Sequence, residues 1–224
     1  MNIHNGHRER LRNRFIEQGL NGFDDVNALE LLLFYAIPRK DTNPIAHALL
    51  ERFGSLDGVF EAPVQELAQV PGVGENAAVL INMLPQMMRK VMVSKTENTR
   101  ILNDVKRAGE YLQPRFLHEQ EEVMLLVCLD SRKRVISCVE ISRGVVNSVA
   151  FNTRKVVECA VLNRADSVII AHNHPNGRIT PSVEDRNATA QIKRSLAAVG
   201  ITLEDSFVIA DEEFVSMARL NLIP

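Results

Sequence analysis

The chain has 224 residues, of which 46% are hydrophobic and 24% are charged, and its formal net charge is −2. The length allows one large domain or two small ones, and the composition is that of an ordinary globular protein. No apolar run approaches the roughly 20 residues of a membrane span, the N-terminus lacks the apolar core of a signal peptide, and the near-neutral charge argues against a strongly electrostatic grip on nucleic acid.

These exclusions make a cytoplasmic protein without a membrane partner the expectation. The three cysteines, Cys128, Cys138 and Cys159, lie in apolar surroundings and none belongs to a CxxC pair. An odd number in such surroundings predicts reduced thiols in the core. A cysteine-based zinc site is therefore not expected.

Residues 1–93 predict a small all-helical domain. The expected helices cover residues 7–16, 25–35, 41–53, 64–68 and 75–91. Asp24 or Asp25 provides a candidate cap for the second helix, and Gly19 and Gly54 follow the first and third as stop signals.

The segment 67–78 contains Gly72-Val73-Gly74 and resembles a helix-hairpin-helix. In that motif the glycines let backbone amides at a helix N-terminus approach a DNA phosphate, whereas the alternative is a tight turn between helices. Residues 1–95 hold 10 Lys and Arg against 11 Asp and Glu, and Glu75 stands where many such motifs carry a basic residue. Weak DNA binding by residues 1–95 is left open, with support from the arginines at positions 8, 10, 12 and 14. Arginines at every second position point to different sides of a helix and do not form one basic stripe. The alternative interpretation is therefore a first helix whose arginines are simply exposed to solvent.

Residues 94–102 are predicted to form a polar linker, and residues 103–224 a compact α/β domain with a mixed sheet. Expected helices cover 103–116, 152–162 (capped by Asn152 and Thr153) and 182–199; expected strands cover 122–129, 134–141, 166–171 and 201–210. The segment Asp130–Lys133 has the composition of a hairpin turn, and residues 142–151 form a loop containing Gly144 and Asn147.

His172 and His174 follow the apolar run 167–171. Two imidazoles at i and i+2 of an extended segment project to the same side, so both reach one ion. Pro175-Asn176-Gly177 turns the loop sharply, so that Asp185 folds back towards the strand end. Two histidines and a carboxylate are ligands of a catalytic zinc, whose fourth position is kept for water.

Two residues at the start of the following helix have an alternative role. Ser182-Val183-Glu184-Asp185 is close to a capping box, in which Ser182 and Asp185 satisfy free helix amides. The ligand role of Asp185 depends on the two histidines, and Glu184 is the reserve ligand. Asn173 is expected to point away from the histidines and to brace the loop.

A metal-bound water needs a base, and the histidines have no neighbouring glutamate as in an HExxH helix. Glu140 is the candidate, because it lies in the otherwise apolar strand 135–141 and a carboxylate there needs a partner or a function. The alternative is that Glu140 points to solvent on the outer face of a hairpin. Glu158 is the second candidate.

The spacing His172-x-His174, seven residues, Ser182, two residues, Asp185 resembles the JAMM signature of the JAB1/MPN metalloprotease domain. The whole chain resembles the bacterial RadC proteins, and the segment 171–175 carries that likeness most closely. The resemblance implies a JAB1/MPN-like mixed-sheet domain with the layered arrangement of cytidine deaminases, behind a helical domain. One departure is Asn152-Thr153-Arg154-Lys155, where RadC relatives often read Pro-Arg-Glu.

Residue by residue, the resemblance implies one zinc ion per chain, bound by His172, His174 and Asp185. Glu140 would act as general base and then protonate the leaving amine. Ser182 would donate a hydrogen bond to the developing oxyanion.

Two functions remain open. The first is a zinc-dependent hydrolase that cuts a peptide or isopeptide bond in an unidentified protein or peptide. The second is a DNA-associated binding module or metal-dependent nuclease, since the RadC name is linked to DNA repair. A deaminase is disfavoured, because the H-x-E and P-C-x-x-C elements are absent.

Overall fold

The contacts within the chain define two units, Met1–Met88 and Arg89–Pro224. The structure, a computed structural model, describes residues 3–96, 101–144, 149–211 and 213–223. No helix in these ranges is both long and apolar enough to cross a membrane.

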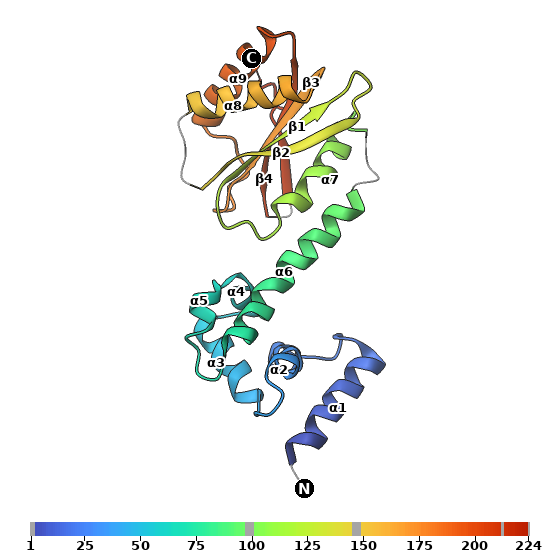
Figure 1. The fold of residues 1–224 in the computed structure, drawn as a ribbon, viewed down its shortest axis with the longest axis vertical. Helices are drawn as coiled ribbons and strands as arrows, with labels where there is room; N and C mark the ends of the chain where they lie inside the picture. The colour runs from blue at the N-terminus through green and yellow to red at the C-terminus, as the bar shows by residue number, and fades with distance from the viewer. Residues whose placement is uncertain (1–2, 97–100, 145–148, 212, 224) are drawn as a thin grey trace. The chain divides into compact units, whose positions relative to one another are not determined.

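The first unit is helical, as expected (Figure 1). Its helices are α1 (Ile3–Gln18), α2 (Asp25–Ala36), α3 (Asn43–Phe53), α4 (Leu56–Glu61), α5 (Val64–Leu67) and the first part of α6 (Glu75–Thr96). Asp24 caps α2 by accepting a hydrogen bond from the backbone N–H of Asn27. Gly54 ends α3 with a φ of 82°, a conformation that favours glycine. The apolar side chains of α2, α3 and α6 form one core.

A five-stranded mixed sheet organises the second unit. Its strands are β1 (Val123–Leu129), β2 (Val135–Arg143), β3 (Ser167–Asn173), β4 (Thr202–Ala210) and β5 (Glu213–Ser216), in the spatial order β2-β1-β3-β4-β5. β1 runs antiparallel to both β2 and β3, whereas β3 and β4 are parallel and β5 returns antiparallel to β4. A mixed sheet was the expectation.

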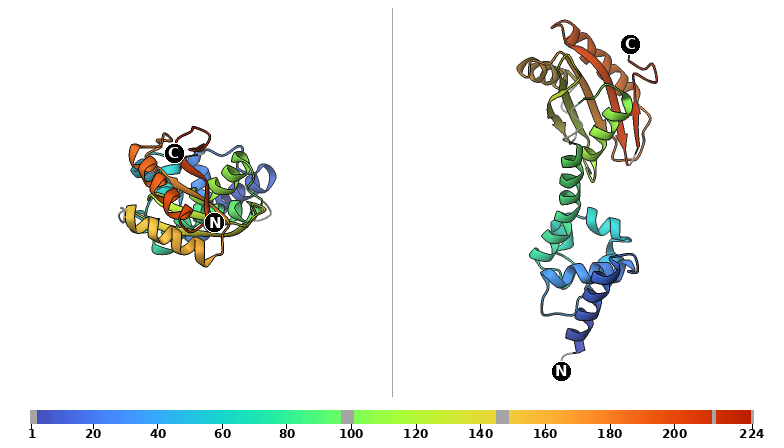
Figure 2. Two further views of the ribbon diagram at one scale, coloured as in Figure 1. Left: turned by 90° about the horizontal axis from the view of Figure 1, so that it is seen from above. Right: turned by 90° about the vertical axis from the view of Figure 1, so that its right-hand side faces the viewer.

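Helices cover both faces of this sheet (Figures 1 and 2). α7 (Val105–Phe116) packs against alternate residues of the strands, such as Leu125 and Ile169. α8 (Val149–Leu162) and α9 (Val183–Ala197) pack against the residues between them, such as Leu126 and Ile170. Because successive side chains of a strand point to opposite faces, residue parity decides which layer each side chain enters.

The observed boundaries differ from the expected ones at several places. α6 continues to Thr96, so residues 94–96 are helical, and Ile101 pairs with Arg134 as an isolated bridge. The part of the expected linker at 97–100 and of the expected loop at 145–148, including Asn147, lies outside the described residues. α8 begins at Val149, so Asn152 lies inside this helix and does not cap it. α4 and β5 are short elements that the sequence pattern did not indicate.

Candidate metal centre

His172 and His174 project from the end of β3 on the side that faces α9. Ile170, two residues earlier, packs with the α8 and α9 side chains, whereas Ala171 packs with those of α7. The alternation of a strand therefore places both histidines in the α9 layer and Asn173 in the α7 layer. The sequence predicted this division.

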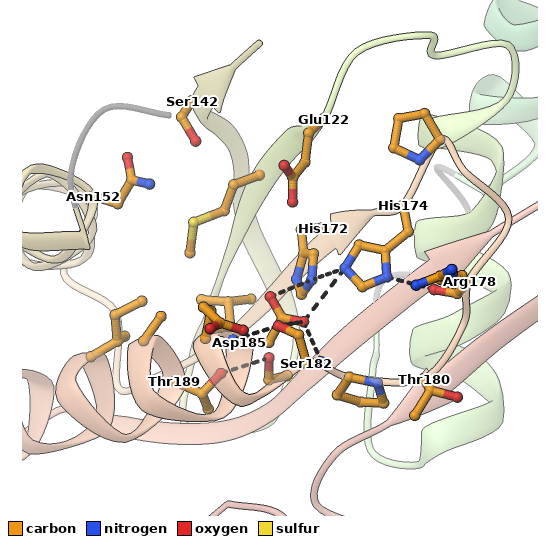
Figure 3. A pocket seen from close by; sticks show the side chains of 18 of the residues that line it. Glu122, Ser142, Asn152, His172, His174, Arg178, Thr180, Ser182, Asp185 and Thr189 are labelled. Atoms are coloured by element: carbon orange, nitrogen blue, oxygen red, sulfur yellow. Dashed lines mark hydrogen bonds and ion pairs between the residues drawn. The ribbon is translucent and has the colours of Figure 1, made fainter. Parts of the chain in front are cut away.

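The three expected ligands meet at one point (Figure 3). The Nε2 atoms of His172 and His174 lie 3.1 Å apart. Asp185 Oδ1 lies 3.2 Å from His172 Nε2, and its Oδ2 lies 3.5 Å from His174 Nε2. A tetrahedral zinc with bonds of about 2.0–2.1 Å needs donor atoms about 3.3 Å apart. The two imidazole nitrogens have the separation of donor atoms around one zinc ion, and each faces a different oxygen of Asp185 at a similar distance.

The ring of His174 is oriented by its own loop. Its Nδ1 lies 2.5 Å from the backbone carbonyl oxygen of Arg178. A carbonyl only accepts, so this bond requires the proton on Nδ1, and in the neutral ring Nε2 then carries the lone pair that a metal ion would take. Gly177 turns the loop with a φ of 73° and donates its N–H to the His174 carbonyl at 3.1 Å. The sharp turn predicted at residues 175–177 thus returns Arg178 to the histidine.

Ser182 and Asp185 form the capping box that begins α9, and Asp185 also faces the histidines. Ser182 Oγ and the Ser182 N–H both donate to Asp185 Oδ2, each at 2.7 Å, and Ser182 Oγ accepts from the Asp185 N–H at 3.0 Å. The two expected uses of these residues therefore coexist. Burial alone would raise the pKa of the Asp185 carboxyl, but the bond to His172 and those from Ser182 hold it well below its usual range.

Glu122 brings a further carboxylate close to the histidines. One oxygen of Glu122 and one ring nitrogen of each histidine all lie within 4.8 Å of one another. Glu122 directly precedes β1, and Met124, two residues on, pairs with His172 in the sheet. Glu122 therefore shares the α9 side of the sheet with the histidines, and its side chain is exposed (Figure 3). No local sequence pattern indicates a role for this residue.

The expected position of Glu140 is corrected by the structure. Glu140 pairs with Leu125, whose side chain faces α7, so Glu140 lies on the opposite face of the sheet from His172. It bonds to Arg143 at 2.8 Å, is 44% exposed and does not line the pocket around the histidines. The register of β1 and β2 causes this placement, since Glu140 pairs with Leu125, and the bulge that follows Glu140 brings Ser142, the partner of Met124, to the side of the histidines. The alternative of an outward-pointing glutamate describes Glu140 better than the role of general base.

The two reserve residues also have defined places. Glu158 on α8 is exposed and bonds to Arg154 at 2.7 Å, away from the pocket. Glu184 is exposed and lines the pocket beside Asp185. Lys155, at the departure from the family pattern, donates to the backbone carbonyl of Ile141.

Asn173 holds the segment that carries Glu122. Its Oδ1 accepts from the backbone N–H of Val123 at 2.7 Å, and its Nδ2 donates to the carbonyl of Glu121 at 3.0 Å. Asn173 is 4% exposed, so these are buried bonds. Asn173 was expected to brace the loop after the histidines, and these bonds instead hold the segment that leads into β1.

A pocket of about 780 Å³ surrounds these groups, which is within the usual range for ligand sites. Its described lining includes Glu122, His172, His174, Ser182 and Asp185 at one side and Asn152 of α8 at the other (Figure 3). Two histidines, an aspartate and a further carboxylate in such a pocket are side chains that could hold a divalent metal ion.

In the first unit, two of the four arginines of α1 bind other parts of their own unit. Arg8 donates to the carbonyls of Ile37 and Lys40, at 2.7 and 2.5 Å. Arg14 donates to Gly22 at 2.8 Å and stacks on Phe23. A second pocket lies instead between Arg39, Lys40 and the turn Gly72–Gly74.

The fold and site define a mixed-sheet α/β protein in which two histidines and an aspartate meet between the end of β3 and the start of α9. Residues 102–222 match the family model described as RadC-like JAB domain. A UPF0758 protein of Fusobacterium nucleatum is 33% identical over 225 residues, covering 97% of each chain. Another UPF0758 protein, from Ruegeria pomeroyi, is 34% identical over 203 residues, covering 91% of each chain. The chain therefore belongs to the family of proteins with a RadC-like JAB domain.

Proposed function

We propose that this protein is a zinc-dependent hydrolase that cleaves a peptide or isopeptide bond. The observation that carries this proposal is the group His172, His174 and Asp185, whose facing atoms lie 3.1–3.5 Å apart beside Glu122. Membership in a family with a JAB domain is consistent with it.

His172, His174 and Asp185 would hold the ion. When bound, zinc lowers the pKa of a coordinated water and polarises a carbonyl. A carboxylate oxygen of Glu122 takes up the proton of the attacking water and returns it to the leaving amine. Glu122 suits this task because it reaches the same side of the group yet lies outside the close triad of ligands.

Ser182 orients the side chain of Asp185. Its hydroxyl and its backbone N–H both donate to Oδ2, which fixes the carboxylate opposite the histidines. The same hydroxyl would donate a hydrogen bond to the oxyanion of the substrate only after it turns away from Asp185. We propose the oxyanion role of Ser182 with this rotation as part of it.

Metal binding is tested with purified full-length protein. We expect about one zinc per chain by elemental analysis and a fall in the unfolding temperature when a chelator removes it. The double variant His172→Ala, His174→Ala should bind no zinc, while His47→Ala, an exposed histidine on α3, should bind it normally. Wild-type protein that is folded and binds no added zinc would overturn the proposal.

The base is tested with two isosteric variants. Zinc-loaded protein is assayed on a library of fluorescence-quenched peptides, with capture of protein substrates by the Glu122→Gln variant as a second assay. Glu122→Gln should keep zinc and lose at least about 100-fold in rate. Glu140→Gln, on the opposite face of the sheet, should keep both. Equal rates for Glu122→Gln and wild type would remove Glu122 from the reaction.

A second candidate function, weak binding to the DNA backbone, rests on the pocket at the hairpin turn. Arg39 and Lys40 are exposed there beside Gly72 and Gly74, which combines cationic side chains with a turn open to close approach. The double variant Arg39→Ala, Lys40→Ala should weaken salt-sensitive binding of duplex DNA, and Arg10→Ala, Arg12→Ala on α1 serves as the control. If both double variants lose the same amount of DNA affinity, the binding depends on total positive charge and not on the pocket at the hairpin turn.

A further inference from the structure

The pocket beside the histidines has a polar rim and an apolar floor. The apolar floor consists of Met124, Ile170, Ala188 and Ile192. Ile170 and Ile192 are 3% and 2% exposed, so this part lies below the surface. Neither the proposed metal ligands nor the proposed base accounts for it.

The sheet supplies one side of the floor. Met124 is the direct partner of His172 across β1 and β3, and Ile170 precedes His172 by two residues on the same face. Side chains that are cross-strand partners or two residues apart on a strand are neighbours on one face. The floor therefore begins next to the candidate metal ligand.

α9 supplies the other side. Asp185, Ala188 and Ile192 follow one another at i, i+3 and i+7, which is one face of a helix. Ala188 is small, and Ser206, the partner of Ile170 on β4, is small too. Because Ala188 and Ser206 are small, space remains between α9 and the sheet, one helical turn from Asp185.

The hydroxyls near the floor are already engaged. Thr189 Oγ1 and Ser206 Oγ lie 3.2 Å apart, and Thr189 also donates to Met217 Sδ at 3.8 Å. These groups therefore do not demand a polar ligand. The charged lining residues Arg178 and Glu184 are exposed, in contrast to Ile170 and Ile192 of the floor, which are buried.

We infer that the apolar floor receives an apolar side chain of the substrate residue that contributes the carbonyl at the metal centre. This inference rests on the proposed function and names its substrate class, a peptide segment with an aliphatic residue at the cleaved bond. The main chain would lie along the polar rim, and burial of the side chain would give the specificity.

Three hydroxamates that bind zinc through the same group test the inference without an assay of activity. Zinc-loaded full-length protein is titrated by calorimetry with acetohydroxamate, isocaproyl hydroxamate and glutaryl monohydroxamate. The isocaproyl compound should bind at least about tenfold more tightly than acetohydroxamate, because each buried methylene adds several-fold in affinity. The glutaryl compound, with a charged end, should gain nothing over acetohydroxamate.

Two variants of α9 locate the effect. Ala188→Phe fills the floor and should abolish the advantage of the isocaproyl compound over acetohydroxamate, both measured on variant protein that has bound zinc. Ala197→Phe, at an exposed position of the same helix, should keep that advantage.

The outcomes separate the two proposals. Equal affinity of wild type for acetohydroxamate and the isocaproyl compound would overturn the apolar floor as a subsite and leave the zinc centre standing. A tenfold advantage retained in folded Ala188→Phe would also overturn it. Zinc-loaded protein that binds none of the three compounds, or protein that binds no zinc, would overturn the proposed function and this inference with it.

Discussion

The side-chain oxygen of Asn173 accepts a hydrogen bond from the backbone N–H of Val123, at 2.7 Å. Asn173 lies between the two histidines in sequence, and Val123 follows Glu122. A single residue of β3 therefore links the candidate ligands on one face of the sheet to the segment of the candidate base. The middle residue of the His-Asn-His sequence contributes to the site from the opposite face.

Replacement of Asn173 by alanine should destabilise the second unit by about 1–3 kcal/mol. The N–H of Val123, a residue that is 2% exposed, would lose its partner in a place that water does not reach readily. Urea denaturation of the full chain measures the change. Zinc binding should persist, because the variant removes none of the three proposed ligands.

A matched asparagine provides the control. Asn187 lies on α9 and is exposed, so Asn187→Ala should change the free energy of unfolding by less than about 0.5 kcal/mol. An Asn173→Ala variant as stable as Asn187→Ala would show that the bond to Val123 contributes nothing measurable.

Gly109 marks a tight contact between α7 and β5. A Cβ built on this buried glycine would overlap the ring of Phe214. Gly109→Ala should therefore destabilise the protein by about 1–3 kcal/mol, although alanine favours a helix over glycine by about 1 kcal/mol. The midpoint of urea denaturation checks the sign.

Shortening the opposing side chain tests the cause. The double variant Gly109→Ala, Phe214→Leu should be more stable than the sum of the two single changes predicts. Additive losses would mean that the ring of Phe214 is not what excludes a side chain at position 109.

The sequence contained most of the framework of the site. The apolar strand at 167–171 and the i, i+2 histidines placed His172 and His174 on one side of β3, and the spacing to Asp185 placed the carboxylate at the start of α9. These features are local, since each depends on strand alternation or helix capping within a few residues. The cap of α2 at Asp24 could be predicted for the same reason.

The position of the candidate base could not be predicted from local pattern. Glu140 lies in β2 and Glu122 directly precedes β1, and which of them faces the histidines depends on the register between β1, β2 and β3. The bulge between the pairs Met124–Ser142 and Leu125–Glu140 changes which residues of β2 face α9. A shift of one residue reverses the face of a side chain, so the choice between the two glutamates required the sheet itself.

Glu119 should make part of the stability depend on pH in the acid range. Burial raises the pKa of its carboxyl, but hydrogen bonds from Arg143 and the charges of Arg89 and Arg143 outweigh burial and lower it. A carboxyl with a lower pKa in the folded state stabilises fully above its unfolded pKa of about 4.3, and the gain is lost as pH falls through the folded value. Glu119→Gln should therefore lose less stability than wild type on acidification below that pH.

The control for this titration is an exposed glutamate. Glu51 lies on α3, and the variant Glu51→Gln should follow the wild-type pH dependence. Urea denaturation of the three proteins at several pH values compares them. If Glu119→Gln runs parallel to wild type over the whole acid range, the ion pairs of Glu119 do not contribute to the acid dependence.

We expect Arg8 to contribute to the stability of the first unit and not to DNA binding. Its guanidinium donates to Ile37 and Lys40 and lies 4.6 Å from the ring centre of Phe34, at the C-terminal end of α2. Carbonyls at a helix C-terminus lack partners within the helix and attract cations. We expect Arg8→Ala to destabilise this unit by about 1–3 kcal/mol. Arg8→Lys should restore little of that stability, because an ammonium does not reproduce the planar fork of donors.

The control is Arg10→Ala, at an exposed position of the same helix, which should leave the stability unchanged. Hydrogen exchange of α1 and α2 in the full chain measures the effect, and equal protection in Arg8→Ala and Arg10→Ala would return Arg8 to the group of solvated surface charges.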